Sequence, residues 1–170
     1  MPDSAAKPTF LVDASADPVL VRIEGRACFQ NSACLRDFFA EMRRQGKCRF
    51  VLDFQHCQNM DSTFLGVLAG AALELRKLQP PGSMVLARVG AHNLELFRNL
   101  GLHRLLMIDA GDCKVGPDQG ATPLACHDRT ELENARLALE AHENLVTVDE
   151  ANRGKFQDVL SFLKNRVEQG

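Results

Sequence analysis

The sequence predicts an α/β domain, a mixed sheet of four to five strands flanked by helices, followed by a C-terminal helical pair. Three observations lead to this fold class. Short apolar segments typical of strands alternate with longer segments of helical spacing, and the connections between them have lengths normal for a compact domain. The alternation then stops at a stretch rich in Gly, Pro, Asp and Gln, after which only helical patterns follow.

The first half of the domain contains three predicted strands and one helix. A strand is expected over 9–12, and apolar residues alternate with polar ones over 19–25, as in a strand with one buried face. A helix is expected over 31–45, because Asn and Ser at its start are capping residues and a glycine follows its end. The run 49–54 is apolar on both faces, so we place this strand at the centre of the sheet.

Two helices and two strands complete the predicted domain. A long helix is expected over 61–79, where it begins at an Asp and stops at two prolines. A strand over 83–89 and a short helix over 93–100 follow, and the helix ends at a glycine. The apolar segment 105–109 is the last predicted strand.

We divide the chain into a domain over 8–112, a linker over 113–128 and a helical extension over 129–170. Helices are expected over 130–144 and 149–168, and the second has a clear apolar stripe. A helical pair cannot bury such stripes alone, so it packs on its own domain, on a second copy or on a partner. A homodimer is therefore one expected possibility.

Composition excludes several classes of function. The chain has 170 residues and a formal net charge of −2, with both signs interspersed and no basic stripe. We therefore expect no nucleic-acid partner. The apolar runs are too short to cross a bilayer and the first residues do not resemble a signal peptide, so we expect a cytoplasmic protein without membrane insertion.

Six cysteines are spread along the chain without a C-x-x-C pair or the Cys/His spacing of metal ligands. This pattern predicts neither a zinc site nor a redox dithiol, and we interpret most of the six as small buried residues. Cys and His are neighbours at 56–57 and at 126–127, but a nucleophilic thiol needs a base close in space, which adjacency does not establish. The six are Cys28, Cys34, Cys48, Cys57, Cys113 and Cys126.

The start of the helix over 61–79 is the candidate functional site. Asp61 is a helix-capping residue type, and Ser62 and Thr63 follow at the first helical positions. Free backbone N–H groups and the positive end of the helix dipole favour a phosphate there. On a helical wheel Ser62 projects toward a flat outer side, whereas Thr63 points more laterally. Ser62 is thus the more accessible hydroxyl, although an Asp-Ser-Thr sequence is by itself usually only a helix cap.

The outer side of this helix is unusually small and flat. Two interpretations remain open, because glycines four residues apart permit either a partner to dock or another element of the same fold to approach closely. The residues of this side, beside Ser62, are Gly66, Ala69, Gly70 and Leu73.

Three motifs occur in an order and at spacings that resemble the STAS domain, the fold of bacterial anti-sigma factor antagonists. The segment 60–66, M-D-S-T-F-L-G, is similar to the family's phosphorylation motif M-D-S-[ST]-G-L-G. The segment 96–102, L-F-R-N-L-G-L, is similar to its L-F-x-x-[ST]-G-L, and 21–25, V-R-I-E-G, matches its second strand and the following glycine. The resemblance covers residues 8 to about 112 and leaves out the helical extension.

The resemblance implies a phosphorylation-switched protein-binding module that acts in signal transduction and transcription regulation. In that family the serine after the aspartate is phosphorylated by a partner kinase, often an anti-sigma factor, and dephosphorylated by a serine phosphatase. The unphosphorylated form binds the partner. Ser62 is then the expected phosphoacceptor and Thr63 the second choice. The expected partner-binding residues are Asp61, Ser62, Gly66, Ala69, Gly70 and Leu73.

Two departures from the family pattern bear on this function. Phe64 stands where the family has Gly, and we expect its ring to be buried as the first core residue of the helix. The segment 25–28, G-R-A-C, replaces the family's G-E-[IL]-D and loses two acids near the motif. Because those acids help to form the kinase-facing surface in the relatives, the mode of docking is expected to differ.

The sequence bears on two other classes of function. Related domains serve as ligand- or lipid-handling accessory subunits of transport systems, which is the alternative function. The sequence has no G-x-x-x-x-G-K-[ST] phosphate loop, no G-x-S-x-G elbow and no H-E-x-x-H. We therefore expect no enzymatic activity, no cofactor and no metal.

Overall fold

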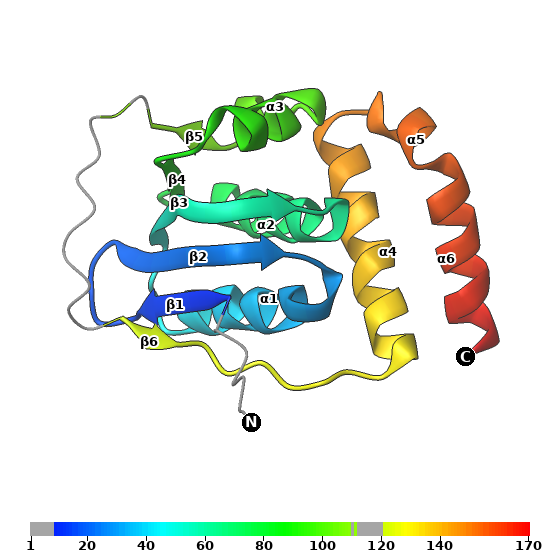
Figure 1. Cartoon of the computed structure of the whole chain (residues 1–170), viewed down its shortest axis with the longest axis horizontal. Coiled ribbons are helices and arrows are strands. Elements are labelled where there is room, and N and C mark those ends of the chain that lie inside the picture. The colour runs from blue at the N-terminus through cyan, green and yellow to red at the C-terminus, as the bar shows by residue number, and fades with distance from the viewer. Residues whose placement is uncertain (1–8, 110, 112–120) are drawn as a thin grey trace.

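The computed structural model describes residues 9–109, 111 and 121–170, and its centre is a six-stranded mixed sheet in the order β5-β4-β3-β2-β1-β6 (Figure 1). The mixed α/β architecture predicted from the sequence is confirmed. The strands are β1 (Phe10–Asp13), β2 (Val19–Ala27), β3 (Arg49–Met60), β4 (Ser83–Ala87), β5 (Met107–Ile108) and β6 (Thr122–Pro123). β2, β3, β4 and β5 pair in parallel, whereas β1 pairs antiparallel with both β2 and β6.

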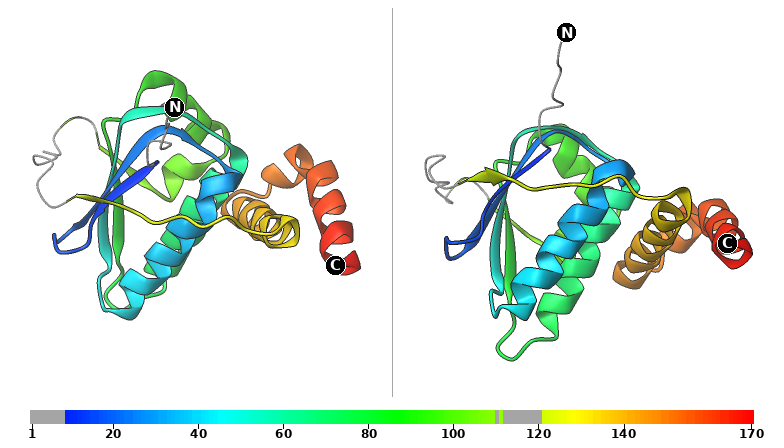
Figure 2. Two further views of the ribbon diagram at one scale, coloured as in Figure 1. Left: turned by 60° about the horizontal axis from the view of Figure 1, so that its bottom comes forward. Right: turned by 90° about the horizontal axis from the view of Figure 1, so that it is seen from below.

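The helices form layers on one face of the sheet. α1 and α2 cover that face, α4 packs on the side of α2 away from the sheet, and α6 packs on α4 (Figure 2). The helices are α1 (Phe29–Arg44), α2 (Ser62–Arg76), α3 (Ala91–Asn99), the short 3-10 helix η1 (Leu102–Arg104), α4 (Glu131–Val148), α5 (Asn152–Lys155) and α6 (Gln157–Gln169). No helix in this described part of the chain is long and apolar enough to span a membrane.

The structure has one strand more than the four to five predicted. β6 lies inside the segment predicted as a linker, where Pro123 pairs with Leu11 and Thr122 with Val12. Two residues are too few to show a periodicity, so no pattern in the sequence could indicate this strand. The linker is thus partly paired with the sheet.

Element ends differ from the predictions near the candidate site. β2 continues through Gly25, whose positive φ of 72° accompanies an irregular register with β3, and it ends at Ala27. α1 begins at Phe29, two residues before its predicted start. Asn31, predicted as a capping residue at the start of the helix, lies inside the first turn and caps it from there, since its Oδ1 accepts the Cys28 N–H at 3.0 Å.

A single apolar core lies between the sheet and the inner helices. From α2, Phe64 and Leu68 reach this core, whereas Val67 packs outward in a smaller cluster with α4. The Phe64 ring has no exposed surface and stacks on Phe10 with ring centroids 6.1 Å apart. The expectation that Phe64 is a core residue is confirmed, and the ring fills space that a glycine would leave to other side chains.

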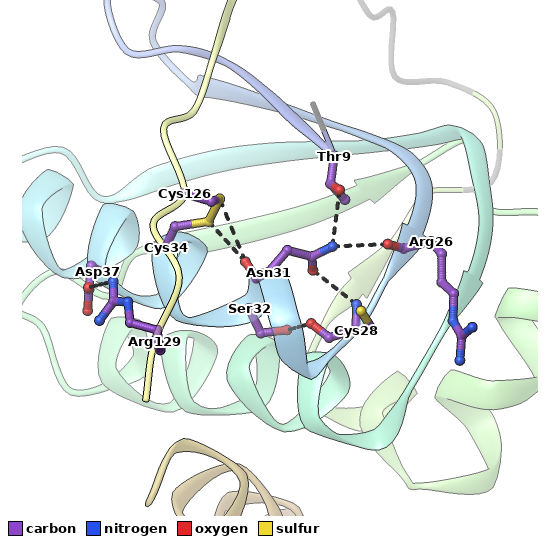
Figure 3. The surroundings of a disulfide bond; sticks show 9 residues. All are labelled: Thr9, Arg26, Cys28, Asn31, Ser32, Cys34, Asp37, Cys126 and Arg129. Carbon is purple, nitrogen blue, oxygen red and sulfur yellow. Dashed lines mark hydrogen bonds and ion pairs between the residues drawn. A yellow bond between two sulfur atoms is a disulfide. The ribbon is translucent and has the colours of Figure 1, made fainter. Parts of the chain in front are cut away.

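A disulfide links α1 to the segment that leads into α4. Cys34 and Cys126 are bridged with their Cα atoms 5.2 Å apart, and Arg129 nearby pairs with Asp37 of α1 at 3.0 Å (Figure 3). Our interpretation of most cysteines as packing residues therefore missed this pair. The two half-cystines are 92 residues apart, and such a pairing cannot be inferred from spacing. Cys113 lies outside the described residues.

The C-terminal helices pack on their own domain, which is one of the three alternatives left open by the sequence. Leu145 of α4 is fully buried in the main core. Asn152 is also fully buried, and its Nδ2 donates to the carbonyl oxygens of Leu100 at 2.9 Å and Leu145 at 2.8 Å. The far end of α4 is therefore joined to the end of α3 by buried contacts.

Truncation of Phe64 to Ala is expected to lower the free energy of unfolding by about 3–5 kcal/mol, because it leaves a cavity beneath α2 and removes the stack with Phe10. Urea unfolding followed by circular dichroism measures this change. Phe162→Ala is the matched control, since that ring is 68% exposed and its removal should change stability by less than about 0.5 kcal/mol. Equal effects of the two substitutions would contradict the assignment of Phe64 to the core.

Candidate phosphoacceptor site at the start of the second helix

The side chain of Asp61 joins the starts of α1 and α2. One carboxylate oxygen accepts the Phe64 N–H at 2.9 Å and so caps α2, while the other accepts the Phe29 N–H at 2.8 Å at the start of α1. The Asp61 N–H in turn donates to the carbonyl oxygen of Ala27 at 3.1 Å. The N–H groups of Phe29 and Phe64 lie in the first turns of α1 and α2, where they would otherwise lack a partner within their own helix. Asp61 thereby fixes where α2 begins and where Ser62 lies.

Ser62 is half-buried and contacts a histidine from the C-terminal extension. Its Oγ lies 2.8 Å from Nε2 of His142 in α4. Nδ1 of the same ring lies 2.6 Å from the carbonyl oxygen of Ala138, which can only accept a hydrogen bond. In the neutral ring the proton is therefore on Nδ1, and Nε2 accepts the hydroxyl proton of Ser62.

The histidine is held firmly in this orientation. His142 is only 4% exposed, and its ring packs edge-on against Phe156 with centroids 4.9 Å apart. His142 could not be found from the sequence, because it lies 80 residues from Ser62, in the part of the chain outside the family resemblance. A single histidine in a helix gives no signal of its own.

Thr63 is buried, with an exposed fraction of 5%, whereas Ser62 keeps part of its surface accessible. The helical wheel ranked the two hydroxyls in the same order. The structure thus places Ser62 as the outward hydroxyl at the start of α2, and its role as a phosphoacceptor stays a prediction.

The flat side of α2 is covered by α4 and is therefore not exposed. A Cβ atom added to Gly66 would lie 2.2 Å from the carbonyl oxygen of Ala141, and one added to Gly70 would lie 2.4 Å from Nδ2 of Asn144. The same Nδ2 donates to the carbonyl oxygen of Gly66 at 3.2 Å. The two glycines therefore allow α4 to approach α2 closely, which is the second of the interpretations that the sequence left open.

The remaining predicted residues of this side have different surroundings. Ala69 has no exposed surface and belongs to the main core, so the helical wheel placed it wrongly. Leu73 is half-buried and lines a groove of about 440 Å³ between α1, α2 and α4. Charged residues of both signs surround this groove, namely Arg36, Asp37, Arg43, Glu74, Lys77 and Glu140.

An amide replaces acids in the neighbouring turn. The family pattern G-E-[IL]-D places an acid just before the first helix. This chain has Cys28 at that position, and Asn31 supplies the polar contacts of the turn (Figure 3). Its Nδ2 donates to Thr9 Oγ1 at 3.0 Å and to the carbonyl oxygen of Arg26 at 3.1 Å. The turn is therefore stabilised without the negative charge expected in relatives, which leaves Asp61 as the acid at the helix start.

Neither Cys-His neighbour pair forms a nucleophile. Cys57 is buried, and burial raises the pKa of its thiol to about 11, so it stays protonated at neutral pH. Its neighbour His56 is exposed. Cys126 is bonded to Cys34. Within residues 9–109, 111 and 121–170, no group of three or more His, Cys, Asp or Glu side chains is arranged to hold a metal ion.

These features define a class of protein: a small mixed α/β domain whose candidate site is the capped start of a helix. The chain belongs to the STAS domain family, because a family model described as "Mlab, STAS domain" matches residues 10–108, more than half of the chain. The match includes α1, α2 and the candidate site. It ends before the helical extension.

One solved structure supports the same fold. The anti-sigma factor antagonist SpoIIAA in its unphosphorylated form is 18% identical, covers 62% of this chain and 89% of its own, and superposes with a TM-score of 0.51. SpoIIAA in its phosphorylated form, described as a Bacillus cell fate determinant, is 20% identical, covers 59% of this chain and 91% of its own, and has a TM-score of 0.49. A search of curated proteins found no match. At these identities the likeness concerns the fold.

Asp61→Ala is expected to lower the free energy of unfolding by about 1–2 kcal/mol, because the N–H groups of Phe64 and Phe29 lose their acceptor. Chemical denaturation measures the loss. Thr130→Ala, which removes the corresponding cap of α4, should cost less, because that cap is exposed and serves a single helix. A loss at Asp61 no greater than that at Thr130 would contradict the joining role.

Proposed function

We propose that this chain is a phosphorylation-switched protein-binding module of the anti-sigma factor antagonist type. Its unphosphorylated form binds a serine kinase or anti-sigma factor through the start of α2, and phosphorylation of Ser62 prevents that binding. The observation that carries the proposal is the hydroxyl of Ser62, half-buried at a capped helix start in a STAS domain. Along α2, Gly66 lets another group approach the helix backbone closely, as Ala141 of α4 does.

Electrostatics gives a reason for the switch. A phosphate on Ser62 adds a charge of about −1.5 to −2 at neutral pH. A partner that buried this position would have to desolvate the charge or pair it, which disfavours a close fit. The carboxylate of Asp61 adds repulsion at the adjacent residue, while the positive end of the α2 dipole offsets part of it.

The proposed docking surface consists of one end and one side of α2. Ala69 no longer belongs to it, because that residue lies in the core. The proposed partners are an anti-sigma factor or related serine kinase and a serine phosphatase, and the output is transcriptional signalling. The module binds and is modified, and we assign it no reaction of its own. Its surface residues are Asp61, Ser62, Gly66, Gly70 and Leu73.

A second candidate function is an accessory subunit of a transport system that handles a ligand or lipid. One observation favours it: the family model that matches the chain has the description "Mlab, STAS domain". In that case the start of α2 would dock without a covalent switch. If Ser62→Asp and the unmodified chain bind a transport ATPase with equal affinity, the result would support this candidate over the first.

The proposed switch predicts that Ser62 is phosphorylated in cells. The chain isolated from cells that contain its serine kinase is expected to carry one phosphate on Ser62, detected by mass spectrometry. Ser62→Ala should remove this phosphate, and Thr63→Ala should retain it, because the Thr63 hydroxyl is buried. In a pull-down with the kinase, Ser62→Asp should weaken binding by at least about 10-fold relative to Ser62→Ala, which corresponds to 1.4 kcal/mol.

Two results would contradict the proposal. One is an unmodified Ser62 in cells that contain an active kinase bound to the chain. The other is equal binding by the Asp and Ala variants. A phosphate that persists in Ser62→Ala and is lost in Thr63→Ala would move the switch to Thr63.

The proposed cytoplasmic location can be tested through Cys34 and Cys126. Disulfides are rare in the reducing cytoplasm, so the bridge between Cys34 and Cys126 should be reduced to two thiols there. Rapid alkylation of cells followed by mass spectrometry should find both residues alkylated, together with Cys48 as an unbridged control. Recovery of the bridged peptide from freshly quenched cells would contradict this location.

A further inference from the structure

We propose that α4 is an intramolecular cover of the α2 docking surface, and that a phosphate on Ser62 prevents the cover from closing. This inference rests on the proposed function and adds a regulatory step to it. In the unphosphorylated chain the cover and an external partner compete for the same side of α2. Binding and phosphorylation then both require an open form in which α4 has moved away.

The contact between α4 and α2 has the character of a fitted interface. At its centre the backbone of Ala141 lies against Gly66, where there is no room for even a methyl group. Val67 packs in a separate apolar cluster with Leu137 and Ala141 of α4 and with Ala33 of α1. The side of α2 that the sequence marked as small and flat is thus the side that receives α4.

The hydrogen bond between Ser62 and His142 connects this cover to the modification site. The distance of 2.8 Å between Ser62 Oγ and His142 Nε2 is that of a direct hydrogen bond, so a phosphorus atom and its oxygens have no space between them. The ring cannot turn aside alone, because Ala138 holds Nδ1 and Phe156 packs on its edge. With the Ser62 side chain in this rotamer, phosphorylation therefore requires that part of α4 move with His142.

The ends of α4 limit how far it moves. Ahead of the helix, Arg129 pairs with Asp37 of α1. Beyond it, the buried Asn152 binds the carbonyl oxygen of Leu100. The proposed motion is therefore a shift of the middle of α4 away from α2, in which Asn144 also releases the carbonyl oxygen of Gly66.

The three states have different functions. In the closed form, α4 lies on α2 and Ser62 binds His142, so the surface is hidden. In the open form the surface is available to the partner and Ser62 to the kinase. In the phosphorylated form α4 cannot return, and the charge itself excludes the partner. The apparent affinity of the unphosphorylated chain is then lowered in proportion to the small fraction of open form.

The main experiment uses the full chain with phosphoserine incorporated at position 62 during translation, so that no kinase is needed. Amide hydrogen exchange over 137–144 in α4 is expected to become at least about 10-fold faster than in the unmodified chain. Amides of β3 should keep their protection, which shows that the domain remains folded. Phosphoserine at position 161, an exposed site on α6, is the matched control and should leave the exchange of α4 unchanged.

A pair of variants tests the cover without altering α2. Ala141→Phe places a large ring against the backbone of Gly66 and should speed exchange over 137–144 as phosphoserine does. Glu143→Phe introduces the same ring on the exposed side of α4 and should not. With the purified partner kinase, Ala141→Phe should accelerate phosphorylation of Ser62 by at least about 10-fold, because the open form is more populated.

Unchanged protection of α4 in the phosphoserine-62 chain would overturn the cover, because His142 would then accommodate the phosphate in place. Equal exchange in Ala141→Phe and Glu143→Phe would overturn it as well. Neither result depends on whether cells phosphorylate Ser62. Conversely, an absence of Ser62 phosphate in cells would refute the proposed function and leave the exchange measurements valid.

Discussion

The carboxylate of Asp61 is the contact on which the arrangement of the inner helices depends. α1 and α2 start at the same edge of the sheet, and each presents N–H groups that no residue of its own helix can satisfy. Asp61 accepts one from each helix, at 2.8 Å from Phe29 and 2.9 Å from Phe64. This shared acceptor sets the relative position of the two starts. The direction of Ser62, and with it the contact to His142, follows from this position.

The fold of the domain could be predicted because its signals are local. Alternation over 19–25 and the apolar run 49–54 indicate strands from their own residues, and Asp61 is a cap by residue type. The other part of the site depends on distant residues. His142 reaches Ser62 from 80 positions away, Cys34 pairs with Cys126 across 92, and β6 has only two residues. Glycines at 66 and 70 showed that a close neighbour was possible, but they could not show that α4 fills the space.

The position of α4 changes how the domain should be regarded. Without α4, the side of α2 that carries Gly66 would be uncovered. Here Leu145 enters the main core and Asn152 is buried against the end of α3. The C-terminal end of α4 is therefore part of the folded domain, while the middle of α4 packs on α2. Its anchoring and its covering are therefore separate properties, carried by different residues. A helix held at its ends can be displaced at its centre while the rest of the fold stays intact.

The contact between Gly66 and Ala141 also has an evolutionary consequence. The two backbones are so close that the combined size of the residues at these positions is limited. In relatives that keep the C-terminal helices, a side chain at position 66 is tolerated only if the helices separate, so positions 66 and 141 should vary together. In relatives that lack the extension, position 66 is free of this constraint and should follow the needs of the partner alone. Because the family motif itself has Gly at position 66, a small residue at position 141 is what this contact demands of a relative that carries such a helix.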